Sequence, residues 1–455
     1  MVRAIRVDEY NRFTKLLVLL REWFLDSLTL VPVLCLIGAG LLAWIMFNIE
    51  TSILEQADTF ASLFGSTASA ISVTSVIASS MLSFLAVVFS VTLVALQLAN
   101  QQFSPRVLRT FIRSTIVKVM LGLSIGTFAY ALLILYFGIK TDDATTPFPT
   151  VSVAVLLVLV TTIFFVVFVK KILTMMRVGY IISMIANETH ESIQDVFPPE
   201  EAYRQCPEVM LGKPYQVIHY AKGGRLSPLP REGQGVFLAV DNGHLVQLAQ
   251  KQKATIRVLP HTGEYIINGD PVLAVYGDAE IPPKECLSTF FVEPERSIQQ
   301  DPAYGFRALV DIALQALSPA VNAPTTATQV IYRLTALLLA IARRPPPTGY
   351  YADKTNIVRL LRPTTDWEAY VNLAFEEIIE FGATSSQVRH TLQLSFDHLL
   401  EETPPDLHEP LQKQQQRLSA TVVGVDSAVN GMEQRSNLET EKISAVFDEE
   451  LEHDG

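Results

Sequence analysis

Four long apolar stretches near the start of the chain constrain what it can fold into more than any other feature. A helix of about 20 apolar residues spans the roughly 30 Å hydrocarbon core of a bilayer, and each stretch is close to or above that length. We therefore expect an α-helical membrane protein with four transmembrane helices. The stretches lie near residues 28–47, 71–99, 119–137 and 151–169.

Charged residues are unevenly divided along the chain, whose formal net charge is −11. Up to Arg177 there are 13 Lys and Arg against 9 Asp and Glu, whereas the remainder has 22 against 37. Hydrophobic residues make up 49% of the chain and charged residues only 18%, which is typical of a membrane segment joined to a soluble region. Nucleic acid is not an expected partner, because phosphate binding requires a clustered basic face.

Basic residues gather in alternate connections between the apolar stretches. This asymmetry predicts orientation, because Lys and Arg are retained on the cytoplasmic side of a membrane. The other two connections contain Lys140 as their one basic residue, beside several acidic residues. We therefore expect a multi-pass protein of the plasma membrane with both termini in the cytoplasm. The basic groups are Arg3, Arg6, Arg12, Lys15 and Arg21; Arg106, Arg109, Arg113 and Lys118; and Lys170, Lys171 and Arg177.

The sequence predicts a soluble region of two parts. Short β-like runs separated by turn signals come first, and we expect them to form a small barrel or sandwich in which HLVQLAQ (244–250) is a strand after the turn DNG. Amphipathic helical patterns bounded by Pro and Gly follow. The expected segments are a transmembrane domain (1–177), a juxtamembrane helix and linker (178–209), a cytoplasmic β module (210–292), a cytoplasmic helical domain (293–432) and an acidic tail (433–455).

Motifs that carry chemistry are scarce. The sequence contains no G-x-x-x-x-G-K-[ST] phosphate loop, no G-x-G-x-x-G after a strand, no H-E-x-x-H and no G-x-S-x-G. Cys35, Cys206 and Cys286 are too dispersed for a thiolate metal site, and the 8 His residues show no metal-ligand spacing. We therefore expect no enzymatic activity, no metal and no cofactor.

The second apolar stretch carries small and polar residues along one line of a helix, which advances by about 100° per residue. Such a stripe has two interpretations. One is close packing between helices, since small side chains let backbones approach; the other is the lining of a water-filled pore, because the stripe is uncharged and wettable. The two merge if several copies pack the stripe around a central axis. The stripe consists of Ser72, Ser75, Ser79, Ser83, Ala86, Ser90, Gln97 and Gln101.

The third apolar stretch contains Gly122 and Gly126 in a G-x-x-x-G spacing, which favours close contact between helices. None of the four stretches has an ionisable residue at its centre. Since charges within the membrane mark proton relays and many ion-coupled transporters, the sequence argues against a proton-driven or sodium-driven pump.

One segment of the soluble region, 301–327, has the pattern of a helical hairpin. One helix ends near a Ser-Pro pair, a tight loop follows, and we expect the hydroxyl of Thr325 or Thr326 to cap the amides of the next helix. Two interpretations stay open for the polar residues here: a purely structural hairpin, or a contact site for a ligand or partner. These residues are Asp301, Asp311, Ser318, Asn322, Thr325 and Thr326.

Two motifs of the chain resemble those of a known family. They are SVTLVALQLANQQFSPRVLRTF (90–111) and DPAYGFRALVDIALQALSPAVNAPTTA (301–327). Over nearly its whole length the chain resembles the bacterial predicted membrane proteins designated domain of unknown function 2254. The resemblance implies a four-span inner-membrane protein with a large cytoplasmic region and no assigned activity. That family usually has Arg and Asp where this chain has Gln315 and Ala323. If the Arg and Asp of the family form an ion pair, this chain lacks both partners, so neither charge is left without the other.

These features lead us to expect a homo-oligomeric ion channel of the bacterial plasma membrane, lined by the second span and gated by the cytoplasmic region. Its partners would be the lipid bilayer, other copies of the chain and ions. The order of spans, β module and helices resembles that of small mechanosensitive channels, a likeness of architecture alone. The alternative is a membrane-anchored sensor or scaffold that binds a ligand or partner through the cytoplasmic helical domain, in which case the serine stripe only packs helices.

Overall fold

A computed structural model of the chain provides the structure. It describes residues 2–6, 29–53, 67–102, 114–138, 148–209, 211–221, 234–278, 280–298 and 300–421, so the expected acidic tail lies outside the described residues. The chain forms two compact units. The membrane unit comprises residues 11–181, and the C-terminal unit comprises residues 1–10 and 182–455.

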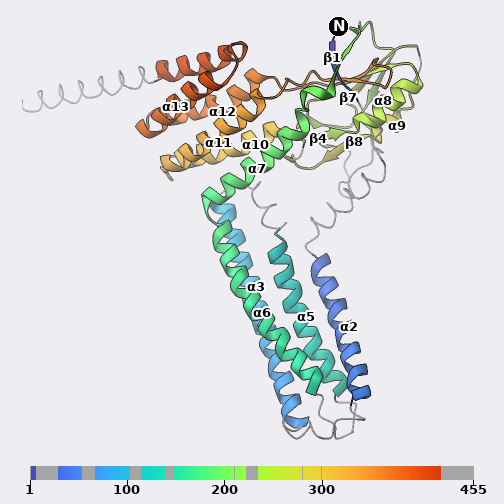
Figure 1. Cartoon of the computed structure of the whole chain (residues 1–455), viewed down its shortest axis with the longest axis vertical. Coiled ribbons are helices and arrows are strands. Elements are labelled where there is room, and N and C mark those ends of the chain that lie inside the picture. Colours follow the sequence, from blue (N-terminus) through green and yellow to red (C-terminus); the bar gives the residue numbers. More distant parts are fainter. Residues whose placement is uncertain are drawn as a thin grey trace, which may run out of the picture. The chain divides into compact units, whose positions relative to one another are not determined.

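Four long helices build the membrane unit, and each coincides with one of the predicted apolar stretches (Figure 1). α5 packs against the other three, which leave many aliphatic side chains exposed. Exposed aliphatic surface is what helices surrounded by lipid hydrocarbon require. The four helices are α2 (Leu30–Ile53), α3 (Thr67–Gln102), α5 (Thr115–Gly138) and α6 (Phe148–Met175).

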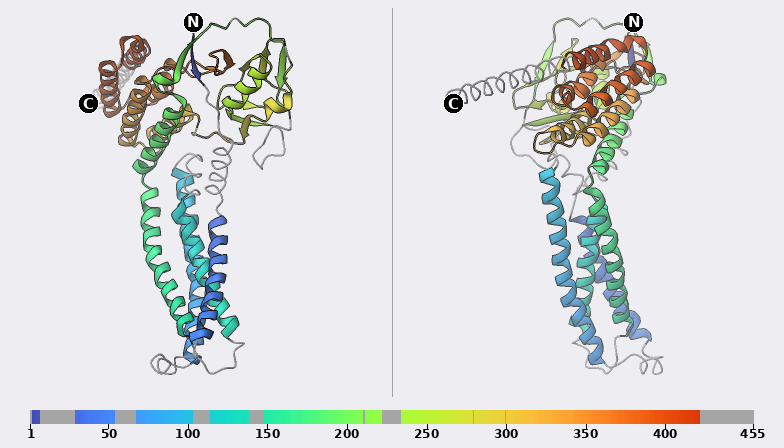
Figure 2. Two further views of the ribbon diagram at one scale, coloured as in Figure 1. Left: turned by 45° about the vertical axis from the view of Figure 1, so that its right-hand side comes forward. Right: turned by 90° about the vertical axis from the view of Figure 1, so that its left-hand side faces the viewer.

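Two β-sheets and a group of helices build the C-terminal unit (Figure 2). The strand order is β2-β1-β9-β10-β5-β7-β3 in the seven-stranded sheet and β6-β4-β8 in the three-stranded sheet. The strands are β1 (Val2–Arg6), β2 (Tyr203–Cys206), β3 (Gln216–His219), β4 (Gly235–Val240), β5 (Thr255–Val258), β6 (Tyr265–Ile266), β7 (Pro271–Tyr276), β8 (Phe290–Glu293), β9 (Tyr350–Ala352) and β10 (Val358–Leu361). The helices are α7 (Val178–Val196), which begins in the membrane unit, α8 (Asn242–Lys251), α9 (Pro283–Leu287), α10 (Pro302–Leu317), α11 (Pro324–Ala342), α12 (Trp367–Gly382) and α13 (Ser386–Glu402).

The described strands do not confirm the small barrel or sandwich expected within residues 210–292. The larger sheet takes β1 from the start of the chain and the hairpin β9–β10 from beyond α11. β1 pairs antiparallel with β2 and parallel with β9, and β10 pairs parallel with β5. The added strands have three to five residues, too few for an alternation of apolar and polar residues to mark them in the sequence.

Residues 244–250, expected as a strand, lie in helix α8 instead. The carboxylate of Asp241 accepts a hydrogen bond from the backbone N–H of His244 at 3.1 Å, which caps the first helical turn. The sequence DNG therefore starts a helix and does not form a hairpin turn. Leu245 and Leu248 then face the core at helical spacing.

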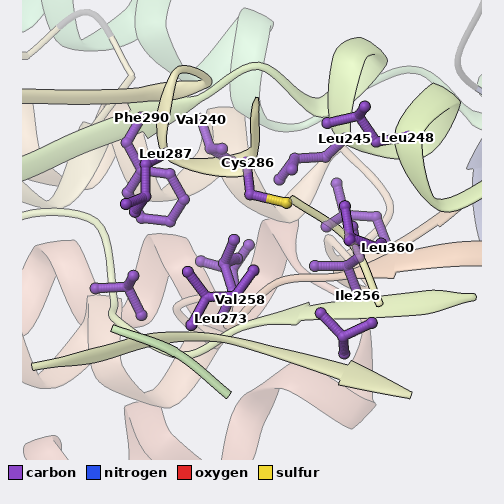
Figure 3. Packing of buried hydrophobic residues seen from close by; sticks show 14 of the residues in the cluster. Val240, Leu245, Leu248, Ile256, Val258, Leu273, Cys286, Leu287, Phe290 and Leu360 are labelled. Atoms are coloured by element: carbon purple, nitrogen blue, oxygen red, sulfur yellow. The ribbon is translucent and has the colours of Figure 1, made fainter. Parts of the chain in front are cut away.

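Buried apolar side chains from α8, α9 and both sheets form one cluster (Figure 3). Cys286 of α9 lies within it, and burial, with a smaller effect of Glu285, raises the pKa of its thiol to about 12. Such a thiol is protonated at neutral pH and is a poor nucleophile. Leu360 of β10 belongs to the same cluster, so residues beyond the expected β module complete its core.

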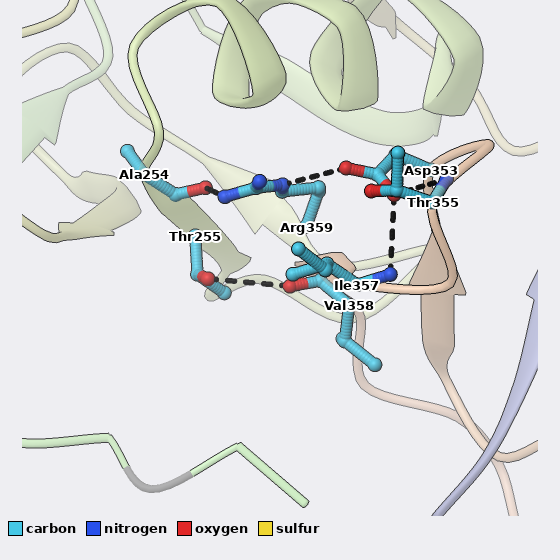
Figure 4. Close-up of polar contacts among 7 residues, drawn as sticks. All are labelled: Ala254, Thr255, Asp353, Thr355, Ile357, Val358 and Arg359. Atoms are coloured by element: carbon cyan, nitrogen blue, oxygen red, sulfur yellow. Dashed lines mark hydrogen bonds and ion pairs between the residues drawn. The ribbon is translucent and has the colours of Figure 1, made fainter. Parts of the chain in front are cut away.

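A buried ion pair fastens the β9–β10 hairpin next to β5 (Figure 4). Arg359 donates from Nε to Oδ2 of Asp353 at 2.9 Å and from Nη1 to the carbonyl oxygen of Ala254 at 3.3 Å. The hydroxyl of Thr255 donates to the carbonyl oxygen of Val358 at 3.3 Å. These bonds connect strands that lie about 100 residues apart in the sequence.

By length and composition, five helices among the described residues are long and apolar enough to cross a membrane. The fifth is α11, which packs against α10, α12 and α13 in the C-terminal unit. Leu334 and Leu338 on its inner side are fully buried, whereas Tyr332 and Arg333 are exposed. A mostly helical membrane protein with a sheet-containing C-terminal region is thus confirmed, and the number of four crossings stays a prediction.

Candidate functional site

The stripe of small and polar residues on α3 faces away from the rest of the membrane unit. The buried side of α3 lies about half a helical turn away from it and consists of Thr74, Ala78, Met81, Val88 and Ala95. Within the described residues the stripe therefore takes no part in the packing of one protomer. Its exposed members are Ser72, Ser75, Ser79, Ser83, Ala86, Ser90 and Gln97. The side chain of Gln101 lies outside the described residues.

Several stripe hydroxyls donate to carbonyl oxygens of their own helix. Ser72 donates to Ala68 at 2.8 Å, Ser79 donates to Val76 at 3.1 Å, and Ser83 donates to Ser79 at 3.4 Å. Such bonds satisfy the hydroxyl hydrogen while the oxygen keeps its capacity to accept. The stripe is thus a narrow, uncharged surface that can accept hydrogen bonds from water or from a neighbouring helix.

Gly122 and Gly126 lie on the side of α5 that meets α2. A Cβ at Gly122 would lie 2.8 Å from Sγ of Cys35 and 3.3 Å from Cα of Pro32. A Cβ at Gly126 would lie 3.2 Å from the carbonyl oxygen of Cys35. The G-x-x-x-G spacing therefore brings α2 and α5 together within one protomer.

A pair of threonines joins α5 to α6, and no pattern in the sequence predicts it. The hydroxyls of Thr127 and Thr161 lie 3.0 Å apart, and both side chains are buried. A hydrogen bond of this kind between membrane helices contributes about 0.6 kcal/mol. In the described part of this unit the buried charged side chain is Lys118, in the first turn of α5 and away from the middle of the bundle.

Asp301 stands at the start of α10 and is buried. Its carboxylate accepts the backbone N–H of Tyr304 at 3.1 Å and two hydrogen bonds from Arg296, at 2.7 and 3.0 Å. Burial raises the pKa of Asp301, and the Arg296 guanidinium opposes that rise. Arg296 also lies over the Tyr304 ring, 5.1 Å from its centroid, so these side chains tie the connection after β8 to the first turn of α10.

The polar residues of segment 301–327 do not converge on one point. Asp311 pairs with Arg307 at 2.8 Å on the same helix, and Arg307 also contacts Glu377 of α12. α10 has 16 residues, so about 24 Å separate Asp301 from Ser318. Among the residues that the structure describes, no group of three or more His, Cys, Asp or Glu side chains could hold a metal ion.

Ser318 and Asn322 shape the loop between α10 and α11. Ser318 donates from Oγ to the carbonyl oxygen of Gln315 at 2.7 Å, and its own carbonyl oxygen accepts the backbone N–H of Asn322 at 2.9 Å. Asn322 has a φ of 44°, in the left-handed region that Asn tolerates better than most residues. The contacts of both residues in the structure thus shape the loop itself.

α11 begins at Pro324, and Ala323, which has no capping side chain, occupies the N-cap position. The expectation that Thr325 or Thr326 caps this helix is wrong, because both residues lie inside its first turn. Pro is preorganised for the first helical position and lacks the N–H that a cap would satisfy, so it sets the start of the helix. The carbonyl oxygen of Thr325 accepts a hydrogen bond from the Thr328 hydroxyl at 2.8 Å.

Two arginines of the α11 segment hold α7 near both of its ends. Arg333 donates to Oγ of Ser183 at 3.0 Å, and Arg344 donates to the carbonyl oxygen of Gln194 at 3.1 Å. Arg344 thereby places a cation at the C-terminal end of α7, where the helix dipole favours it. α7 is thus fixed to the helical part of the C-terminal unit.

The chain is similar to several known sequences. The family model described as Predicted membrane protein (DUF2254) matches residues 26–398. The uncharacterized proteins Rv1290c of Mycobacterium tuberculosis and Mb1321c of Mycobacterium bovis are each 27% identical to the chain over 317 residues. These matches cover 68% of this chain and 59% of each relative, so the chain spans less than two thirds of their length. No solved structure matches.

Proposed function

Because the chain belongs to the family of predicted membrane proteins DUF2254, whose relatives named above are uncharacterized, we propose that it is a homo-oligomeric ion channel of the bacterial plasma membrane with α3 lining the pore. The observation that carries this proposal is the exposure of the serine stripe on the side of α3 opposite its buried face. A side of a spanning helix that is not packed within the protomer and carries a line of hydroxyls, here beside exposed aliphatic residues such as Val76 and Leu93, suits water or another protein surface better than a wholly aliphatic side does. The proposed activity is conduction and involves no catalysis.

The outward side of α6 provides the comparison. Its most exposed residues include the aliphatic Leu156, Ile163 and Val166, as expected of a helix that faces lipid. The α3 stripe has hydroxyls and an amide in corresponding exposed positions. The interior of one protomer is filled by apolar side chains such as Met120 and Phe168, so an axis between copies is the better place for a pore.

β1 supports an even number of crossings. Residues 2–6 pair with β2 and β9, which favours the start of the chain and the C-terminal unit lying on the same side of the membrane. The packing of α11 within the C-terminal unit argues against a fifth crossing. Four crossings satisfy both conditions, and the basic residues that follow α6 favour the cytoplasm for that side.

In this proposal the C-terminal unit gates the pore through α7. Arg333 and Arg344 hold α7 to the α11 segment. Met176 and Arg177 alone separate α7 from α6, and helical hydrogen bonds continue through this break, with the N–H of Met176 donating to the carbonyl oxygen of Ile172 at 3.1 Å. A displacement of the C-terminal unit would therefore pull on the end of α6.

Single-channel recording of the purified chain in planar bilayers tests the proposal. We expect discrete currents from the wild type and none from Ser79→Leu/Ser83→Leu, because two aliphatic side chains on consecutive turns narrow and dewet the pore. Ser80→Leu is the matched control, since Ser80 is an exposed serine of α3 outside the stripe. It should conduct like the wild type.

Two results would overturn parts of this account. Silence from folded, oligomeric wild-type protein under voltage, tension and varied salt would overturn the channel. Unchanged currents in the double variant would overturn the assignment of the stripe as the lining. A detergent-solubilised mass of one protomer would also argue against a channel, since four spans enclose little water.

The sensor or scaffold alternative has less support from the geometry of segment 301–327. The carboxylates of Asp301 and Asp311 are engaged by Arg296 and Arg307, and the Ser318 hydroxyl donates within its own loop. These groups are therefore engaged by contacts within the C-terminal unit. Under this alternative the serine stripe only packs helices, and Asn322→Ala should weaken ligand or partner binding without affecting ion flux.

A further inference from the structure

The outward side of α6 ends in two cations. Leu159, Ile163 and Val166 leave 55, 68 and 67% of their surface exposed, and their spacing of three to four residues places them on one side of the helix. Lys170 continues that spacing on α6, and Arg177 follows two residues after the end of the helix at Met175; both side chains are exposed. The rise from Leu159 to Lys170 is about 16 Å, which is about half the hydrocarbon thickness of a bilayer.

These two cations differ from the basic residue between them. The ammonium group of Lys171 donates to the hydroxyl of Tyr180 at 2.8 Å and lies 4.8 Å from the centroid of its ring. Lys170 and Arg177 form no ion pair with a carboxylate in the part of the chain that the structure describes. No described carboxylate therefore neutralises these two charges.

We propose that this side of α6 binds an anionic phospholipid, with acyl chains along Leu159, Ile163 and Val166 and the phosphate between Lys170 and Arg177. An aliphatic ridge one leaflet long that ends in two exposed cations complements both parts of such a lipid. A basic residue at the bilayer surface raises the affinity for anionic lipid about fivefold. The site goes beyond the channel proposal and does not depend on it, because α6 faces lipid in either function.

α2 offers a contrast within the same unit. Its outward side carries a similar ridge formed by Leu34, Ile37, Leu41 and Trp44. The next residue on that side is Asn48, which is neutral. In the described residues an aliphatic ridge thus occurs on both α2 and α6, and two exposed cations follow it on α6.

Arg177 directly follows the C-terminal end of α6, where the helix dipole favours positive charge. That effect stabilises the helix whichever lipid surrounds it. A dependence on lipid headgroup charge therefore separates a lipid site from simple compensation of the dipole.

Native mass spectrometry of the full chain, released from nanodiscs of equal phosphatidylglycerol and phosphatidylcholine content, tests the proposal. We expect the wild type to retain mainly phosphatidylglycerol, and Lys170→Gln/Arg177→Gln to lower the ratio of the two retained lipids about 25-fold. Lys170→Arg/Arg177→Lys, which keeps both charges, should leave the ratio unchanged. So should Lys251→Gln/Lys284→Gln, which removes two exposed charges from the C-terminal unit.

A wild-type ratio near one would overturn the lipid site, as would an equal fall in the double-Gln variant and the Lys251→Gln/Lys284→Gln control. The thermal unfolding temperature of each variant checks that it is folded. If the double variant does not fold, the single variants Lys170→Gln and Arg177→Gln take its place, each with an expected fall of about fivefold. The readout is lipid retention. The absence of channel currents in the planar-bilayer recording would therefore not affect this test.

Discussion

The side chain of Thr189 on α7 lies so close to Gly305 on α10 that a Cβ at Gly305 would overlap its Oγ1, Cβ and Cγ2 atoms. Glycine within a helix costs about 1 kcal/mol relative to alanine. The missing side chain at Gly305 allows α7 to pack directly onto the backbone of α10. Thr189 lies between Ser183 and Gln194, the residues of α7 that Arg333 and Arg344 bind. The helix is therefore held at three points between Ser183 and Gln194.

Gly305→Ala should lower the stability of the C-terminal unit by about 1–3 kcal/mol, because the added methyl group overpacks the contact with Thr189. A loss of that size lowers the unfolding temperature by roughly 2–4 °C per kcal/mol, measurable by thermal unfolding in detergent. Gly38→Ala is the control, since nothing lies within 4 Å of a Cβ at that position of α2. A Gly305→Ala protein as stable as the wild type would contradict the contact between α7 and α10.

Gly122→Leu should separate α2 from α5, because its side chain would enter the space of Cys35 and Pro32. We expect a loss of about 1–3 kcal/mol in the unfolding of the membrane unit by denaturing detergent. Gly40→Leu, on a surface of α2 with nothing within 4 Å of a Cβ, should unfold like the wild type. Equal effects of the two changes would argue against the G-x-x-x-G contact.

Asp353 predicts a specific pH dependence of stability. Burial alone would raise the pKa of Asp353, but hydrogen bonds from Thr355, Arg359 and the Ile357 backbone outweigh it and hold this pKa below its ordinary value. An acid with a lowered pKa in the folded state stabilises the fold above its unfolded pKa of about 3.9. That contribution is lost as the pH falls through the folded pKa.

Asp353→Asn should therefore cost about 3 kcal/mol at pH 7, because it leaves the buried Arg359 charge without its partner. The difference in unfolding free energy from the wild type should be constant above about pH 5 and shrink below about pH 3.9. Glu191→Gln, at an exposed position of α7, should show no such difference at any pH. Denaturant unfolding at a series of pH values measures the difference in unfolding free energy between the wild type and Asp353→Asn. A difference that does not change with pH would contradict the lowered pKa of Asp353 in the folded state.

Asn322→Ala should destabilise the loop between α10 and α11 by about 1–2 kcal/mol, because a φ of 44° is sterically unfavourable for alanine. Asn322→Gly removes the same amide without that cost and should be close to the wild type. Hydrogen exchange of the loop amides and thermal unfolding compare the pair. If both variants lose equally, the Asn322 side chain, and not its backbone conformation, is what matters.

The apolar helices could be predicted from the sequence because a run of about 20 apolar residues marks a span without any tertiary contact. α8 could not, because Asp-Asn-Gly is compatible with both a hairpin turn and a helix cap, and only the bond from His244 to Asp241 decides between them. β1 has five residues, and its partner β9 begins at Tyr350. Nothing local in the sequence marks a pairing over such a distance.

The members of the α3 stripe could be recognised from helical periodicity, but their direction could not. α3 exposes apolar residues such as Leu82 and Phe89 as well as the stripe, and the packing of Met81 and Val88 is what shows which side is buried. The bond between Thr127 and Thr161 depends on the relative rotation of α5 and α6. A pattern within one helix carries no information about that rotation.

The central claim, that the α3 stripe faces a water-filled axis between copies, is tested most directly by thiol modification in liposomes. The native cysteines are buried or half-buried, so the wild type provides the baseline for a charged, membrane-impermeant thiosulfonate. We predict that Ser83→Cys reacts well above this baseline and loses current on modification, whereas Val166→Cys, on the lipid-facing side of α6, does not react. Reactivity of Ser83→Cys at the level of Val166→Cys would contradict the claim.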